Sequence, residues 1–243
     1  MTDTSAARSF SGIAANAVPM TGTRYAAPVA ETVVRLDLTA LGRELSGAAL
    51  ARTGAGQTAS IELPLADGSF QTFRVFESPV MAPALQAQFP ECRTFEAYGV
   101  GAPAFARFSL TPLGFHAVIF RAGGSVWIDP YQTGDIEHYS VCLKRDYRRA
   151  SAFEEASFIC LTEEDPILVE EINTLVRNME LQGGSQTGDR LRTYATAIAA
   201  TGEYTVFHGG TVALGQAAIV VAVNRLNEVF QREFSAFLEL VPN

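Results

Sequence analysis

The sequence has 243 residues, of which 48% are hydrophobic and 18% charged, with a formal net charge of −8 and a pI of about 4.9. This hydrophobic content is enough to bury a core, so the composition excludes a disordered chain. The acidic balance argues against a nucleic-acid partner, because phosphate recognition needs clustered lysine and arginine. The one dense basic run, residues 144–149, is more typical of a solvated turn.

No membrane span or export signal is predicted. The chain has no run of about 18 uncharged apolar residues, which a transmembrane helix would need. Its start, "MTDTSAARSF", lacks the basic and apolar regions of a signal peptide, so the protein is cytosolic or has lost a signal. Three cysteines, Cys92, Cys142 and Cys160, leave at least one unpaired and do not decide the compartment.

Residues 1–30 are rich in small residues and predict a flexible lead-in. A strand is expected over residues 31–38, followed by a short helix that Thr39 would open. The clearest local pattern is residues 59–76, where two alternating segments flank "ADGS". Asp-Gly suits a tight turn, so this pattern predicts a β-hairpin.

Three further strand candidates, "AFARFSL", "FHAVIF" and "SVWIDPY", follow one another between residues 104 and 131. Short turn sequences join them, which predicts an antiparallel meander. Residues 31–150 are therefore expected to form one β-rich domain.

Residues 151–190 change character and predict a helical linker. Asp165 is a plausible N-cap, Pro166 fits the first helical position, and "GGSQTGD" at 183–189 marks a break suited to proteolysis. The apolar residues at helical spacing are Leu168, Ile172, Leu175, Val176 and Met179.

Residues 191–243 predict a strand over 191–200, a long helix over about 211–234 and a final strand, "AFLELV". The helix has a polar stripe of Gln216, Asn224, Glu228 and Gln231. The residues that face the other way are Ala218, Val221, Ala222, Leu226, Val229 and Phe230. Strand, helix and strand in this order suggest a right-handed βαβ unit, which is too small to close a core alone. The fold class expected for the whole chain is α+β.

The three histidines, His116, His138 and His208, are too far apart for an HExxH helix. The sequence also has no GxSxG, P-loop or GxGxxG motif. His208, in "FHGG", could be a ligand or a base, but a turn residue whose ring packs or caps a helix is the favoured interpretation. His116 and His138 are interpreted as structural.

Two further features carry weaker hypotheses. Asp129, Asp135 and Glu137 could bind calcium, although a solvated loop with Asx turns is the more common outcome. Cys160 could ligate zinc as a thiolate and block a protease site, or it could be a small buried apolar residue.

Four long segments together resemble bacterial secreted zinc metalloproteases of the reprolysin-like metzincin class. Three of them are similar to propeptide sequence: "LPLADGSFQTFRVFESPVMAPALQAQFPECRTFEAYGV", "FSLTPLGFHAVIF" and "VWIDPYQTGDIEHYSVCLKRDY". The fourth, "LRTYATAIAATGEYTVFHGGTVALGQAAIVVAVNRLNEVFQREFSAFLELV", resembles the opening of the catalytic domain. The resemblance spans roughly residues 30–243.

The resemblance implies a secreted or periplasmic endopeptidase whose catalytic zinc is bound by the histidines of HExxHxxGxxH. This sequence lacks that motif, so no catalytic, cofactor or zinc residue can be carried over, and the chain is expected to bind no zinc and to be inactive. Calcium is still considered as a cofactor of this chain. The resemblance makes Cys160 the candidate for a latency thiolate.

The first functional hypothesis is a propeptide plus the start of a zinc endopeptidase domain, whose partner would be the remainder of that domain. The alternative is a free-standing, propeptide-derived β module that binds or inhibits a homologous protease in trans. A third option is an unrelated β-sandwich adhesin with a calcium loop. Because the strands of residues 191–243 lack neighbours of their own, this segment is expected to pack on the β-rich domain or to be poorly ordered.

Overall fold

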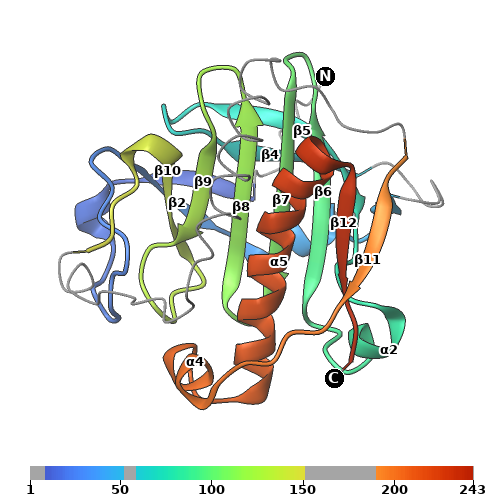
Figure 1. Cartoon of the computed structure of the whole chain (residues 1–243). Coiled ribbons are helices and arrows are strands. Elements are labelled where there is room, and N and C mark those ends of the chain that lie inside the picture. The colour runs from blue at the N-terminus through green and yellow to red at the C-terminus, as the bar shows by residue number, and fades with distance from the viewer. Residues whose placement is uncertain (1–8, 52–58, 151–189, 243) are drawn as a thin grey trace, which may run out of the picture.

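One long, mainly antiparallel sheet dominates the computed structural model of the chain, which describes residues 9–51, 59–150 and 190–242 (Figure 1). Its strands are β1 (Phe10–Ile13), β2 (Thr32–Leu36), β3 (Ala49–Leu50), β4 (Ala59–Pro64), β5 (Phe70–Glu77), β6 (Arg93–Gly99), β7 (Ala104–Thr111), β8 (Gly114–Arg121), β9 (Val126–Pro130) and β10 (His138–Leu143). The strand order is β1-β2-β10-β9-β8-β7-β6-β5-β3, with β4 also paired to β5. The β3–β5 pair is parallel. This sheet confirms the α+β class.

The predicted hairpin and meander are both present. β4 and β5 pair antiparallel around a turn in which Gly68 has a φ of +81°, a backbone conformation that favours glycine. Asp67 accepts a hydrogen bond from the Ser69 amide at 3.0 Å, which fixes the turn. β7, β8 and β9 follow as successive antiparallel neighbours.

The flexible lead-in predicted for residues 1–30 needs correction for its described part. Phe10 is 1% exposed, and β1 pairs with β2, so the start of the described chain is a sheet edge strand. Further along, the side-chain oxygen of Gln132 accepts hydrogen bonds from the amides of Thr21 and Gly22, both at 2.9 Å. The partners that order this segment lie far away along the chain.

Helix α1 (Leu38–Glu44) confirms the short helix after β2, but its cap differs from the prediction. Asp37, and not Thr39, is the N-cap, and its carboxylate accepts a hydrogen bond from the Ala40 amide at 2.9 Å. Helix α2 (Pro83–Gln86) lies between β5 and β6 and has Pro83 in its first turn.

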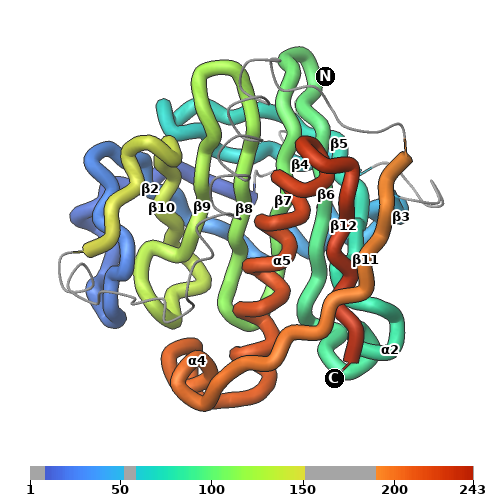
Figure 2. Tube along the Cα trace, in the orientation of Figure 1, coloured from blue at the N-terminus to red at the C-terminus, as the bar shows by residue number. Residues whose placement is uncertain are grey.

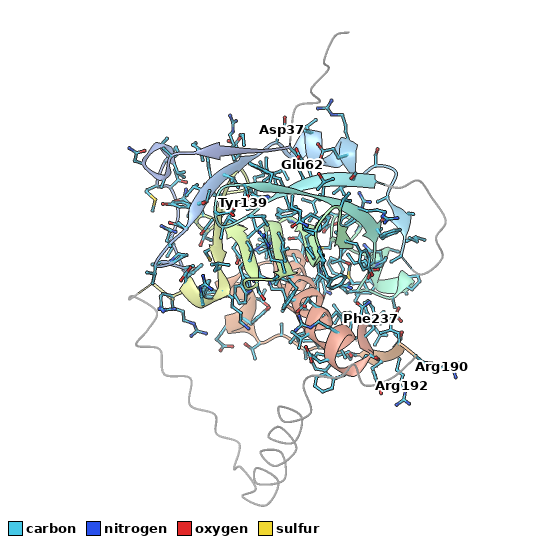
Figure 3. All side chains as sticks on the ribbon, turned by 90° about the horizontal axis from the view of Figure 1, so that it is seen from above. Asp37, Glu62, Tyr139, Arg190, Arg192 and Phe237 are labelled. Atoms are coloured by element: carbon cyan, nitrogen blue, oxygen red, sulfur yellow. The ribbon has the colours of Figure 1, made fainter. Side chains whose placement is uncertain are left out.

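The sheet bends over so that its inner face encloses an apolar core. Strands β1, β2 and β4 form one layer and β7 to β9 the other, with Tyr139 between them (Figure 3). Phe10 packs edge-on against Phe115 with ring centroids 5.2 Å apart, and Phe95 stacks on Phe108 at 4.8 Å. Aromatic pairs of this kind add to the stability that burial provides.

The C-terminal residues form the predicted strand–helix–strand unit. Its elements are β11 (Arg192–Thr196), α4 (Gly202–Phe207), α5 (Val212–Phe234) and β12 (Ala236–Leu240). β11 and β12 pair in parallel beside α5 (Figure 2). The Thr211 side chain caps α5 by accepting a hydrogen bond from the Leu214 amide at 3.2 Å. None of the helices in the described ranges is long and apolar enough to cross a membrane.

Candidate functional interface

The strand–helix–strand unit packs on the outer face of the large sheet, where α5 crosses β7 and β8 (Figure 1). Residues along a strand point alternately to its two faces. In β7, Ala106 and Phe108 point into the core, so Arg107 and Ser109 point outward toward α5. The described part of residues 191–243 thus packs on the β-rich domain, one of the two outcomes expected from the sequence.

Helix α5 turns part of its polar stripe toward the sheet. Asn224 and Glu228 are each 1% exposed, whereas Leu226 is 47% exposed and Val229 39%. Periodicity correctly predicted that Asn224 and Glu228 share a face. It did not reveal that this face would be buried against the β-rich domain.

Arg107 is the centre of the buried contact. Its side chain is fully buried, and its Nε donates to Asn224 Oδ1 at 2.9 Å while Nη1 donates to Gln231 Oε1 at 2.9 Å. Within the β-rich domain, Nη1 lies 3.3 Å from Glu96 Oε2, and Nη2 donates to Ser78 Oγ at 3.1 Å. A buried charge is tolerated when it is paired and hydrogen-bonded, as it is here.

A second polar group forms around Arg225 of α5. Asp129 of β9 forms an ion pair with Arg225 of α5, and the Arg225 guanidinium lies 5.1 Å from the centre of the Trp127 ring. His116 of β8 has its Nε2 4.0 Å from Asp129 Oδ1. Burial, reinforced by the charges of Arg225 and His208 and opposed by that of Asp129, lowers the pKa of His116 to about 4. His116 is therefore neutral at physiological pH.

Glu228 is one of the groups in the described part of this interface whose hydrogen bonding is incomplete. Arg232 Nη1 lies 3.4 Å from Glu228 Oε1, but that buried oxygen accepts no hydrogen bond. Burial raises the pKa of the Glu228 carboxyl to about 7, although Arg232 opposes the shift. The carboxyl is thus partly protonated near neutral pH.

Apolar contacts complete the interface beside the polar ones. Phe237 of β12 lies next to α5 (Figure 3), and backbone hydrogen bonds join Leu240 to Val80 and Ala82 at 2.7 and 2.8 Å. The apolar cluster that links the two parts comprises Val80, Met81, Leu85, Cys92, Ala217, Ile219, Val220, Val223, Phe237 and Leu240. Burial of this cluster contributes hydrophobic attraction between the parts.

The other two histidines each contact a neighbouring side chain. His208 is the C-cap of α4, and its ring packs against Tyr204 with centroids 4.5 Å apart. His138 begins β10, and its Nδ1 lies 3.0 Å from Asp135 Oδ2.

The structure does not gather the three carboxylates of the calcium hypothesis into one site. Asp129 is paired with Arg225, and Glu137 lies on the surface 3.4 Å from Arg35. Asp135 accepts from the amides of Glu137 and His138 at 2.9 and 3.0 Å, the Asx-turn pattern. Burial acts to raise the pKa of Asp135, but these amide bonds and the side-chain hydrogen bonds of Gln132 and His138 together lower it.

Two of the three cysteines are described, and both are buried with free thiols. Burial raises the pKa of Cys92 to about 12 and that of Cys142 to about 11, so neither is a reactive thiolate at neutral pH. Cys160 and the helical linker predicted for residues 151–190 lie outside the described residues, apart from Arg190.

A zinc site does not fit the residues that the structure describes. Within ranges 9–51, 59–150 and 190–242, no three His, Cys, Asp or Glu side chains come together as a metal-binding group. Zinc in proteins takes three or four such ligands. The described part of the chain therefore offers no set of ligands for the metal that its resemblance implies.

Comparison with known families finds a match at the C-terminal unit. The family described as metallo-peptidase family M12B, reprolysin-like, matches residues 190–243. The match spans β11 to β12, and it supports a relationship to reprolysin-like metallopeptidases. A search of curated proteins finds no match.

The sequence did not reveal Arg107 as a site residue. It stands in "AFARFSL", where strand alternation places it opposite the core residues, on a face that a solvated arginine would normally occupy. The sequence groups Asn224 and Gln231 in one polar stripe. No local pattern indicates that this stripe contacts β7.

Proposed function

We propose that this chain comprises a regulatory, propeptide-like β-rich domain and the opening unit of a reprolysin-like zinc endopeptidase domain. The observation that carries the proposal is the coincidence of the family match at residues 190–243 with a parallel strand–helix–strand unit. The docking of that unit on the β-rich domain supports a regulatory role, because side chains of the β-rich domain contact and bury part of α5.

The finer parts of the proposal follow from the same relationship. The complete enzyme would be a secreted or periplasmic zinc protease, and Cys160 would be its latency thiolate. The present chain contains no HExxHxxGxxH, and its described residues offer no zinc ligand set, so we expect no zinc-dependent proteolysis from it.

The test of this proposal is the reading frame that follows codon 243. An in-frame HExxHxxGxxH would support the peptidase assignment, and a frame that closes without it would count against the assignment. As a biochemical check, the purified chain is incubated with zinc and a casein substrate, with and without a chelator. Proteolysis that the chelator abolishes would show that the chain is active and that the expected inactivity is wrong.

A second candidate function is a β module that binds a protease in trans. The chemistry of the interface favours it, because polar side chains line both the sheet face and the covered face of α5. Addition of the chain to a mature reprolysin-like peptidase tests this candidate, and inhibition at stoichiometric concentrations would support it.

A further inference from the structure

Arg107 links the two parts of the chain through hydrogen bonds to amide side chains. Three of its nitrogens take part: Nε and Nη1 reach the helix, and Nη2 reaches Ser78 in the β-rich domain. The guanidinium carbon also lies 5.3 Å from the centre of the Phe237 ring on β12. A planar guanidinium with donors in fixed directions suits such a site better than the single ammonium of lysine does.

The partners on α5 define a particular helix surface. Asn224 and Gln231 are about two helical turns apart and lie on one face. Helical side chains lean toward the N-terminus, so the longer Gln231 reaches back to the same arginine. Asn224 also donates from Nδ2 to Ser109 Oγ at 2.9 Å, next to Arg107 on the same face of β7.

This arrangement makes the docking sensitive to register. A shift of α5 by a single residue would rotate both amides away from Arg107 by about 100°. The buried guanidinium would then lose its two partners on the helix in a site that admits little water, which is strongly unfavourable. The apolar cluster is less selective, because apolar contacts lack direction.

We infer that Arg107 is the residue with which the β-rich domain selects its partner. The partner is a helix that carries amide side chains at the spacing of Asn224 and Gln231, and the selected complex persists without a covalent connection. Residues 9–150 and 190–242 thus remain paired when the chain between them is cut. This inference rests on the proposed function, in which the second part is a peptidase unit.

The experiment uses the full chain, folded first and then cut at a site-specific protease sequence introduced between residues 183 and 189. Size-exclusion chromatography shows whether the two pieces co-elute. The single tryptophan, Trp127, lies beside Arg225 of α5, so its fluorescence reports dissociation after dilution. We expect the unsubstituted pieces to co-elute.

Substitution on each side of the contact then tests the role of Arg107. Arg107→Met should accelerate dissociation by about 30-fold or more, since removal of one partner leaves buried polar groups unpaired. Arg107→Lys should recover only part of this loss. Asn224→Leu combined with Arg107→Met should be less harmful than the product of the two single effects, because each change removes the same contact.

The matched control is Arg74→Met, which removes an exposed arginine from β5 and should leave the dissociation rate unchanged. Separation of the unsubstituted pieces would overturn the inference. It would not bear on the peptidase assignment, which the reading frame that follows codon 243 tests independently. An unchanged rate for Arg107→Met, or full additivity with Asn224→Leu, would also overturn the inference. If Arg107→Met does not fold, the dissociation rates of the Asn224→Leu and Gln231→Leu variants test the inference instead, since both changes leave the β-rich domain intact. Unchanged rates in both variants would overturn it.

Discussion

Replacement of Glu228 by glutamine should stabilise the protein at alkaline pH and leave its stability unchanged in acid. The Glu228 side chain is 1% exposed and its Oε1 accepts no hydrogen bond, so its charged form is poorly accommodated. Burial raises the pKa of Glu228 from 4.5 to about 7. Glutamine keeps the size of the side chain and removes the charge.

The sign and size of the effect follow from proton linkage. Because the folded pKa is raised, the folded chain binds the proton more tightly than the unfolded chain does. The stabilisation is complete below pH 4.5 and is lost as the pH rises through about 7. Each pH unit of this difference corresponds to about 1.4 kcal/mol, so Glu228→Gln should raise the free energy of unfolding at pH 8 by at most about 3 kcal/mol.

Urea unfolding from pH 4 to pH 8, followed by Trp127 fluorescence, measures this difference. The matched control is Glu233→Gln, which removes a charge that also contacts Arg232, at 2.8 Å, from a side chain that is 35% exposed. The control should change the free energy of unfolding by less than about 0.5 kcal/mol at any pH. A Glu228→Gln effect that is constant across this range, or a loss of stability at pH 8, would refute the reasoning.

Three further predictions concern other parts of the fold. His116→Gln should lower the pH at which the protein unfolds in acid, because burial lowers the pKa of His116 to about 4 and its protonation therefore favours unfolding. Acid titration followed by circular dichroism measures this unfolding pH. Asp37→Ala should lower the free energy of unfolding by about 1 kcal/mol through loss of the cap on Ala40, measured in urea, and an unchanged value would contradict the capping role. Phe237→Ala should lower the free energy of unfolding by about 3–5 kcal/mol. It should also increase amide exchange in α5 and β12 more than in the large sheet, and an equal increase in all elements would argue against separate docking of the C-terminal unit.

Local sequence signals predicted the elements whose partners are close along the chain. The β4–β5 hairpin was identifiable because alternation flanks Asp-Gly, and α5 because apolar periodicity follows Thr211. β1 escaped prediction because "FSGI" becomes a strand only through pairing with β2, which lies on the other side of a long connection.

The same limit explains why the interface itself was not predicted. Periodicity identifies residues that share a face of a helix, but it does not say whether that face meets water or another element. The sequence therefore identifies Asn224 and Glu228 only as parts of one polar stripe, whereas the fold places Arg107 and Ser109 of β7 against Asn224. Polar side chains on two distant elements satisfy one another only in the assembled fold, and no local pattern encodes that match.

His116 and Glu228 act against each other when the pH changes. As the pH falls from 6.5 toward 4, the buried neutral His116 lowers the free energy of unfolding, because the unfolded chain binds a proton that the folded chain does not. As the pH rises from 4.5 toward 7, the protonated Glu228 also lowers it, because the unfolded chain releases a proton that the folded chain keeps. The slopes are equal in size and opposite in sign where the two ranges overlap, at about 1.4 kcal/mol per pH unit. The two groups together should contribute almost no pH dependence between pH 4.5 and 6.5, and His116→Gln and Glu228→Gln should each expose a slope of opposite sign. Removal of both groups should restore the flat profile, and a steep profile in the double variant would mean that other groups control the titration.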